Sequence, residues 1–211
     1  MKGSLIIISS PSGGGKGTLI KEILNSLPNI GYSVSYTTRP RRSGETDGRD
    51  YFFVGVDEFN RLIDAGEFLE YAEVHGNFYG TSVNQILAET NLGRDVILEI
   101  DVQGARNVRS KIPEAVGIFI LPPSFEVLRQ RLVARKTEKT EDLQLRLHNS
   151  FDEVRHFDDF EYIIINDEVS NAARNLQSVI LAERMKRIRQ IDSIRGILDS
   201  FDASISDSLG E

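Results

Sequence analysis

The chain has 211 residues, a length that fits one domain with small insertions, and its 40% hydrophobic and 27% charged residues are ordinary values for a soluble globular protein. A net charge of −7 argues against bulk nucleic-acid binding, which needs a positive field. The absence of cysteine excludes disulfides and thiolate metal sites. The apolar run at residues 5–8 is too short for a signal-peptide core or a membrane span, so we expect a cytoplasmic protein without a membrane partner.

Apolar runs alternate with helical patterns along most of the chain. Four of these runs predict buried parallel strands, at residues 5–8, 96–100, 117–121 and 162–165. Residues 33–37 predict a weaker fifth strand. Strands that alternate with helices favour an α/β fold, in which helices flank a parallel sheet.

Two helices have clear starts. Ser82 and Gln85 form a capping box, and Gly93 ends the helix that follows it. The expected apolar stripe of this helix consists of Val83, Ile86 and Leu87. Thr140 predicts the start of a second helix, with acidic residues in its first turn.

Residues 34–82 interrupt the alternation and predict an inserted subdomain. Its aromatic-rich segments 50–54 and 73–79 read as strands. A short helix between them is expected to begin at Asp57 as its cap and to end at Gly66. The side chains expected to face inward are Phe59, Leu62 and Ile63. A second insertion, at residues 129–146, is rich in arginine and lysine.

A glycine-rich loop follows the first strand and precedes a helical pattern. Such a loop lets backbone N–H groups surround an anion at the helix N-terminus, where Lys16 would reach the β- and γ-phosphates of a nucleotide. The strict pattern GxxxxGK(S/T) is broken twice, at Ser10 and at Gly17. A glycine-rich turn with an exposed lysine is the alternative, but the order of strand, glycines, GKGT and helix favours a phosphate loop for ATP. Its ATP-binding residues are expected to be Ser12, Gly13, Gly14, Gly15, Lys16, Gly17 and Thr18.

Gly17 affects the expected metal site. A phosphate loop usually holds Mg²⁺ through the hydroxyl after the lysine, and Gly17 has none. Mg²⁺ is therefore expected on ATP oxygens and waters, with Asp101 at the end of a strand as its carboxylate contact through water. A cap at the end of the strand is the alternative role of Asp101.

The insertion combines hydroxyls, arginines and carboxylates. Arginine forks and tyrosine hydroxyls suit a phosphate dianion, whereas a solvated basic turn is the alternative for the run around Arg39. Carboxylates in the same pocket would repel phosphate, so we expect them to face hydrogen-bond donors of the ligand. Guanine offers N1–H and its 2-amino group, a pair that adenine lacks.

The chain resembles guanylate kinase. The resemblance rests on SPSGGGKGTL, SVSYTTRPRRSGETDGRDYFFV, FLEYAEVHGNFYGTS, ILEIDVQGA and IFILPPSFEVLRQRL, and on Arg146-Leu147. These stretches occur in the order typical of the family and cover about residues 5–189. The resemblance implies transfer of the γ-phosphate of ATP to GMP and dGMP, with Mg²⁺ as the cofactor, small-molecule partners, no nucleic acid, and a monomer or homodimer.

The resemblance also implies roles for particular residues. The clamp on the GMP phosphate would consist of Arg39, Arg42, Tyr51 and Tyr79. The guanine would be read by Ser35, Glu70, Thr81 and Glu99. Lys16 and the lid arginines Arg131, Arg135 and Arg146 would be the catalytic residues, and Asn166 would lie on the adenine side. A phosphate oxygen of GMP is already ionised near neutral pH, so no general base is needed and catalysis is positioning plus charge neutralisation.

The implied organisation has six parts: a core at residues 1–33, 83–128 and 147–195, a GMP-binding insertion at 34–82, a lid at 129–146, and a solvated C-terminal tail at 196–211. The five basic residues between 184 and 195 indicate a solvated helix face, with a dimer contact as the alternative.

Two rival functions stay open. The first is a guanylate-kinase-like interaction module that binds peptides, against which the retained Lys16, Asp101 and lid arginines argue. The second is a related P-loop kinase for another nucleotide or sugar phosphate, against which Glu70 and Glu99 argue.

Overall fold

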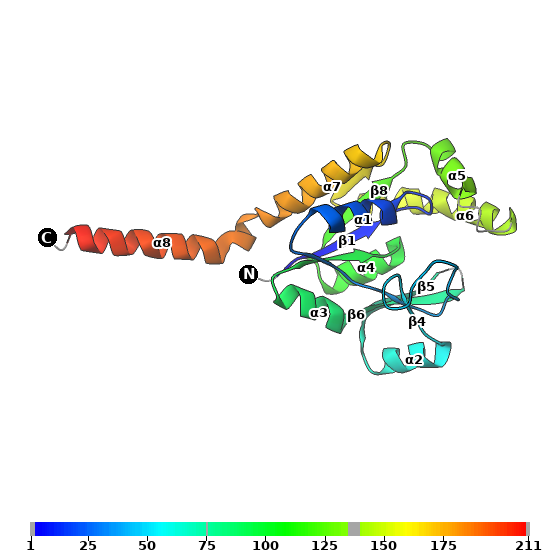
Figure 1. The fold of residues 1–211 in the computed structure, drawn as a ribbon, viewed down its shortest axis with the longest axis horizontal. Helices are drawn as coiled ribbons and strands as arrows, with labels where there is room; N and C mark the ends of the chain where they lie inside the picture. Colours follow the sequence, from blue (N-terminus) through cyan, green and yellow to red (C-terminus); the bar gives the residue numbers. More distant parts are fainter. Residues whose placement is uncertain (1–2, 75, 135–139, 210–211) are drawn as a thin grey trace.

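The computed structural model describes residues 3–74, 76–134 and 140–209, which form a body with one long helix extending from it (Figure 1). The centre of the body is a parallel sheet in which β1 lies in the middle. In spatial order its strands are β2 (Ile30–Tyr32), β7 (Asp95–Glu99), β1 (Leu5–Ser9), β8 (Val116–Leu121) and β9 (Tyr162–Ile165). The four parallel strands expected from the apolar runs are confirmed. Strands β1, β7 and β8 are buried almost throughout, whereas β9, at the edge of the sheet, exposes Ile163 and Ile165.

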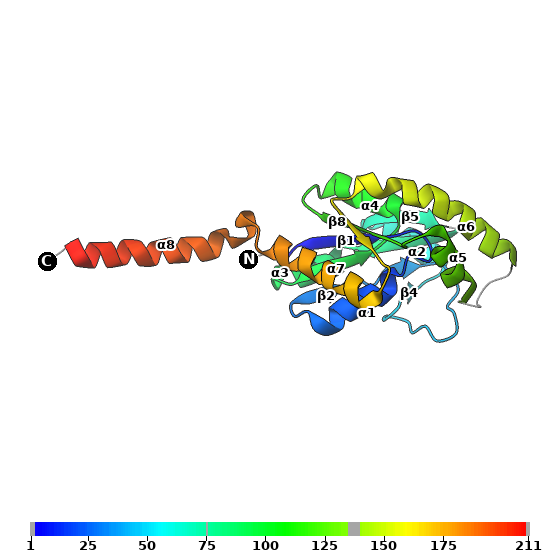
Figure 2. The ribbon, with the colours of Figure 1, turned by 90° about the horizontal axis from the view of Figure 1, so that it is seen from above.

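The alternating side chains of β1 divide the core into two layers. Ile6 and Ile8 belong to the layer that packs against α1 (Lys16–Ser26) and α7 (Val169–Arg184). Leu5 and Ile7 belong to the opposite layer, which contains residues of α3 (Val83–Asn91) and α4 (Val102–Lys111). Helices therefore cover both faces of the sheet, as the α/β expectation requires (Figure 2).

The expected fifth strand at residues 33–37 is wrong. The strand beside β7 is β2 instead, and its pairing ends where the Ser33 N–H donates to the Ile97 carbonyl. The side chain of Gln85 then binds both backbone groups of Val34, accepting from its N–H at 3.1 Å and donating to its carbonyl at 3.0 Å. The backbone is thereby diverted, and β3 (Tyr36–Thr37) joins a second sheet.

The second sheet has the order β4 (Phe52–Phe53), β3, β6 (Asn77–Ser82) and β5 (Phe68–Val74). The expected single strand at 73–79 is wrong, since β5 and β6 form an antiparallel hairpin with Gly76 at φ 72° between them. The short helix is confirmed as α2 (Val56–Asp64), but Gly55 is its N-cap and Asp57 lies in its first turn. Phe59 is fully buried, with its ring 4.8 Å from that of Phe68, so α2 covers this sheet.

Helix α3 begins at the expected cap. The Ser82 side chain accepts from the Gln85 N–H at 3.4 Å, which fixes the junction between β6 and the core. Ile86 is buried as expected, whereas Leu87 is 40% exposed and lies outside the buried stripe.

The expected solvated tail is exposed at residues 196–204, but it is helical. Helix α5 (Phe125–Ala134) and helix α6 (Thr140–Val154), followed by a 3₁₀ turn at Arg155–Asp159, precede β9. Helix α8 (Arg187–Leu209) is one continuous helix that extends away from the body (Figures 1 and 2). Among the described residues, none of the helices combines the length and the apolar character that crossing a membrane requires.

The basic stretch at residues 184–195 is only partly the solvated face expected from the sequence: Lys186, Arg187 and Arg195 are exposed, whereas Arg184 and Arg189 are not. Arg184 and Arg189 both bind the carboxylate of Asp95, at 2.7 and 2.8 Å. Asp95 is buried at the start of β7, and it also accepts from the Ser4 N–H. This buried ion-pair cluster joins the end of α7 and the first turn of α8 to the central sheet.

Candidate active site

The glycine-rich loop connects β1 to α1. Gly15 is the N-cap of α1 with φ 92°, a left-handed conformation that favours glycine. A Cβ at Gly15 would lie 2.3 Å from Nδ2 of Asn166, so a side chain cannot be placed there without displacing Asn166. The same Nδ2 donates to the Gly14 carbonyl at 2.8 Å. The loop is thus held open before the helix N-terminus, the geometry that binds phosphate.

Arg131 reaches this loop from α5. One of its Nη atoms donates to the Asn166 carbonyl oxygen at 2.8 Å. The other, Nη1, is buried, has no hydrogen-bond partner among the described residues, and lies 3.9 Å from the position of a Cβ on Gly15. An unpaired cationic donor beside a phosphate loop is suited to an anion.

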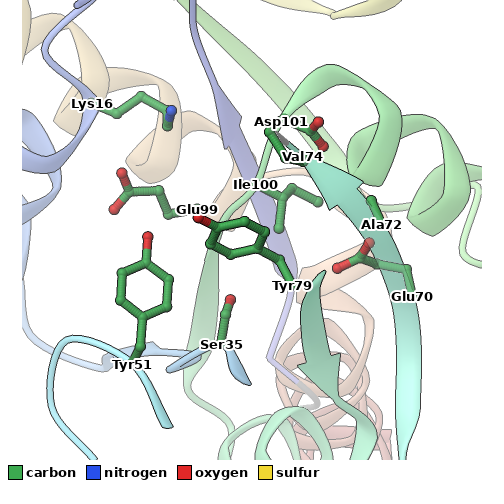
Figure 3. A pocket seen from close by; sticks show the side chains of 10 residues that line it. All are labelled: Lys16, Ser35, Tyr51, Glu70, Ala72, Val74, Tyr79, Glu99, Ile100 and Asp101. Atoms are coloured by element: carbon green, nitrogen blue, oxygen red, sulfur yellow. The ribbon is translucent and has the colours of Figure 1, made fainter. Parts of the chain in front are cut away.

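A cavity of about 170 Å³ lies between the two sheets. Figure 3 shows that Lys16 borders it opposite Ser35, and that the hydroxyl ends of Tyr51 and Tyr79 point toward Glu99. The residues that line the cavity are Lys16, Ser35, Tyr51, Glu70, Ala72, Val74, Tyr79, Glu99, Ile100 and Asp101. Six side chains expected at the nucleotide sites therefore share one cavity with the proposed metal contact.

The expected phosphate-clamp residues are only partly gathered. The rings of Tyr51 and Tyr79 meet edge to face with centroids 5.9 Å apart, and the Arg39 guanidinium lies 5.3 Å from the Tyr51 centroid. Burial and the nearby Glu99 carboxylate raise the pKa of Tyr51 above its usual range, so its hydroxyl stays a donor at neutral pH. Arg42 is exposed and does not line the cavity.

Glu45 holds the arginine segment together. Its carboxylate binds the Arg39 guanidinium at 2.7 Å and accepts from the backbone N–H of Arg42 at 2.8 Å. Glu45 is only six and three positions from these residues, but no role for it was predicted from the sequence. It keeps Arg39 beside the tyrosines and at the same time occupies the group that would bind a phosphate.

Glu70 is the buried carboxylate of the site, only 4% exposed on β5. Its Oε1 accepts from the Thr81 hydroxyl at 2.5 Å across the β5–β6 pair. Its Oε2 would lie 3.0 Å from a Cβ on Gly104, so glycine allows it to approach the start of α4. Burial raises the pKa of Glu70 to about 7, with a further increase from Asp101 that the Thr81 hydrogen bond opposes.

Glu99 lies at the end of β7, at the edge of the sheet where the phosphate loop leaves β1. It accepts from the Tyr32 hydroxyl at 3.2 Å, a contact that the sequence reading missed. Its Oε1 would lie 3.9 Å from a Cβ on Gly17. Glu99 therefore faces the phosphate-loop helix as well as the cavity.

Asp101 caps helix α4, because its Oδ1 accepts from the Gly104 N–H at 2.8 Å. The capping alternative is thus confirmed, and the residue lines the cavity as well. No group of three acidic, histidine or cysteine residues that could hold a metal gathers in the described ranges. Any metal here would need most of its ligands from a substrate or from water.

Glu153 makes a further contact that no pattern in the sequence indicates. It comes from α6 and accepts from the Ser12 backbone N–H at 2.8 Å, 141 positions away along the chain. Ser150, one turn earlier, donates to the Ser12 carbonyl at 3.4 Å. Helix α6 is thereby attached to the first part of the phosphate loop. Arg135 lies outside the described residues, and Arg146 belongs to α6 by its backbone while its side chain lies outside them.

A glycine loop between a strand and a helix, with a lysine and a buried carboxylate cavity beside it, defines a P-loop phosphotransferase. The family model described as guanylate kinase matches residues 2–183. The chain is 48% identical to the guanylate kinase of Geobacter sulfurreducens, over 93% of this chain and 97% of that one. It is 45% identical to the guanylate kinase of Thermotoga maritima, over 92% and 94%. The crystal structure of guanylate kinase from Anaplasma phagocytophilum has a TM-score of 0.77 and 36% identity, with coverage of 94% and 95%.

The chain belongs to the guanylate kinase family.

Proposed function

We propose that the chain transfers the γ-phosphate of ATP to GMP, giving ADP and GDP, and that it also accepts dGMP. The observation that carries this proposal is the buried Glu70, which accepts a hydrogen bond from Thr81 and lines the cavity that Lys16 borders. A carboxylate here would repel a phosphate, but it suits the N1–H and 2-amino donors of guanine. The groups at each end of the cavity then assign the guanine and the phosphate of GMP to opposite ends.

The guanine end would be formed by Glu70 and Thr81, with Ser35 and Glu99 along the sides. Thr81 already donates to Glu70, so one carboxylate oxygen is held and the other is available to the base. Adenine presents an acceptor where guanine has N1–H, and would face a carboxylate without a donor. This mismatch is the source of base selectivity, because an unpaired buried polar group costs about 1–3 kcal/mol.

The phosphate of GMP would be held by Arg39, Tyr51 and Tyr79, with Arg42 added from the same segment. Arg39 is now paired with Glu45, so binding requires the guanidinium to exchange or share that carboxylate with the phosphate. Both tyrosines donate hydroxyl hydrogens, and Arg39 supplies a charge-assisted pair. This fixes the attacking phosphate oxygen toward Lys16.

ATP would bind with its phosphates in the loop from Ser12 to Thr18 and its adenine near Asn166. The buried, unpaired Nη1 of Arg131 supports a phosphate oxygen next to Gly15. Lys16 and Arg131, with Arg135 and Arg146, would neutralise the charge that spreads over the transferred phosphoryl group. The GMP oxygen is ionised before attack, so the residues have no proton to remove.

The residues present fit Mg²⁺ bound together with ATP rather than in a protein cage. Asp101 lines the cavity and would hold the ion through water, and no cluster of three ligating side chains competes for it in the described part of the chain. When bound, Mg²⁺ supplies positive charge to the phosphate oxygens. Gly17 contributes no hydroxyl to it.

Small-molecule substrates and a cytoplasmic location complete the proposal. An acceptor panel tests it: purified protein is given ATP and Mg²⁺ with GMP, dGMP, AMP, CMP or UMP, and ADP formation is followed. We expect high rates with GMP and dGMP only. No turnover with any acceptor would indicate a binding module, and a preference for AMP or a pyrimidine nucleotide would overturn the assignment of Glu70 to guanine.

A further inference from the structure

Helix α8 leaves the body at Arg187 and extends into solvent (Figure 1). It lies beyond residues 2–183, the part of the chain that matches the family model. Its 23 residues correspond to a rod about 35 Å long. Helices in proteins are stabilised mainly by packing an apolar face rather than by intrinsic propensity, so a helix that projects alone from the body needs such a contact.

Such an apolar face is present and uncovered. Ile191, Ile194, Leu198 and Phe201 follow one another at spacings of three, four and three, which is the pattern of a coiled-coil seam. The last three are 39%, 56% and 64% exposed. Side chains of this size on one stripe of a projecting helix favour burial against another helix.

The first turn of α8, called its root below, is anchored to the body by an ion pair. Arg189, in its first turn, binds the buried Asp95 that also binds Arg184 at the end of α7. The helix therefore leaves the sheet in a fixed direction. Figures 1 and 2 agree that it extends away from the side of the body that carries α5, α6 and β5.

The charges on α8 are divided between its two ends. The part near the body, residues 187–198, has three arginines and one aspartate, whereas residues 199–209 have three aspartates and no basic residue. Two such helices side by side in the same direction would place like charges together. In opposite directions, the basic part of each meets the acidic part of the other.

We propose that α8 pairs in the antiparallel direction with α8 of a second copy of the chain. Leu198 then packs against the partner's Phe201, and the two-fold symmetry repeats this contact. Arg195 lies opposite the partner's Asp202. A register shifted by one heptad toward the root would instead put Arg195 beside the partner's Arg195, so the charges select the register as well as the direction.

The root of α8 offers space for the end of the partner helix. A cavity of about 590 Å³ lies there, and Ile188 and Ile191 of α8 line it together with Pro113, Val116 and Tyr162 of the body. In the proposed register the backbone end of the partner's α8, near Leu209, arrives beside Gln190. The interface therefore continues from the exposed seam into this cavity. The nucleotide cavity lies outside the interface.

The first test measures the mass of the full-length chain by sedimentation velocity over a wide concentration range. We expect a reversible dimer. Leu198→Glu puts a charge into the seam twice per dimer, and should raise the dissociation constant by about a hundredfold or more. Ser193→Glu, on the outer face of the same helix, is the matched control and should leave it unchanged. A monomeric wild-type chain, or a dimer that Leu198→Glu leaves intact, would overturn the proposal.

The second test examines direction. Arg195→Glu and Asp202→Arg should each weaken the dimer, by about tenfold, and the double variant should restore it, because only the antiparallel arrangement brings these residues together. Failure of the double variant to restore pairing would overturn the antiparallel register. GMP phosphorylation and far-ultraviolet circular dichroism, measured on every variant, should stay at wild-type values, which separates loss of pairing from loss of folding.

Discussion

Two opposing effects act on the Glu70 side chain: its burial favours the neutral acid, whereas the proposed contact with guanine needs the ionised carboxylate. Burial between β5 and α4 raises its pKa to about 7, so near neutral pH the nucleotide-free protein holds it partly protonated. Guanine, which offers two donors, binds the ionised form. GMP binding is therefore expected to release a proton, and GMP affinity should depend on pH in a range where most carboxylates are fully ionised.

We predict that KM for GMP rises by about tenfold when the pH falls from 8 to 6, because a group with a pKa near 7 must lose its proton before binding. KM for ATP measured at the same pH values should change much less. The GMP phosphate also titrates near pH 6, and Glu70→Gln is the control that retains this effect. An identical pH profile in wild type and Glu70→Gln would show that the ionisation of Glu70 does not affect GMP binding.

The Asp101 carboxylate caps helix α4, and we propose that it also binds Mg²⁺ through water. Asparagine is an equally good helix cap, so Asp101→Asn should preserve α4 and alter only the charge. We predict that this variant needs about 10- to 100-fold more Mg²⁺ for half-maximal activity. Gly17→Ser is the comparison, since the one described atom that a Cβ there would meet is Glu99 Oε1, at 3.9 Å. An unchanged Mg²⁺ requirement in Asp101→Asn would show that Asp101 acts only as the cap of α4.

The chemistry of the site could largely be predicted from residue types in local patterns. The phosphate loop, Glu70, Thr81 and Asp101 stand in short motifs, and the structure brings them to one region. The contacts of Glu153 with Ser12 and of Tyr32 with Glu99 could not be predicted, because each joins residues far apart in the chain through a single hydrogen bond. The spacing of residues along the chain does not indicate such a pair.

Among the elements, apolar runs predicted the four long strands of the central sheet, including β9, whose Ile163 and Ile165 are exposed. The boundary between the two sheets was missed, because it depends on the Gln85 side chain binding Val34, 51 positions away. The β5–β6 hairpin was read as one strand, since its aromatic residues continue on both sides of Gly76. The C-terminal helix was missed because its serine and aspartate content resembles that of a solvated tail.

Helix α6 is attached to the phosphate loop by Glu153. We predict that Glu153→Ala lowers the free energy of unfolding by about 1–3 kcal/mol, because the Ser12 N–H loses a charged acceptor. We also expect a lower kcat, because Arg146, a proposed catalytic residue, belongs to the same helix. Asp152→Ala, at an exposed neighbouring position, is the control. Denaturant unfolding of both variants measures the difference, and equal stabilities would show that the contact contributes nothing.

The junction of α7, α8 and the sheet depends on Asp95. Asp95→Asn leaves two arginines facing a neutral side chain, and breaking a buried ion pair costs about 3–5 kcal/mol. We therefore predict a loss of roughly 3 kcal/mol in unfolding free energy, measured by denaturant titration at several protein concentrations. A loss below about 1 kcal/mol, the range of surface pairs, would contradict the description of this cluster as buried and structural.

At the scale of the whole molecule, the reaction cavity lies where the two sheets meet. One sheet and its phosphate loop would hold ATP, and the other would hold GMP, so transfer requires both parts to approach and exclude water. Helix α8 extends from the opposite side of the body (Figure 1). Catalysis and the proposed pairing of two copies therefore use separate surfaces.

The proposed function requires that this cavity direct the γ-phosphate of ATP to a guanine nucleotide. The most direct measurement supplies ATP labelled at its γ-phosphate to an equimolar mixture of GMP and AMP, and resolves the labelled nucleoside diphosphates by ion exchange. Labelled GDP should exceed labelled ADP by about a hundredfold or more, and Glu70→Gln should reduce this ratio by about 10- to 150-fold, the effect of one charge-assisted hydrogen bond. Equal labelling by the wild-type protein would contradict the proposed transfer to GMP, and a ratio that Glu70→Gln leaves unchanged would contradict the role of Glu70 in base selection.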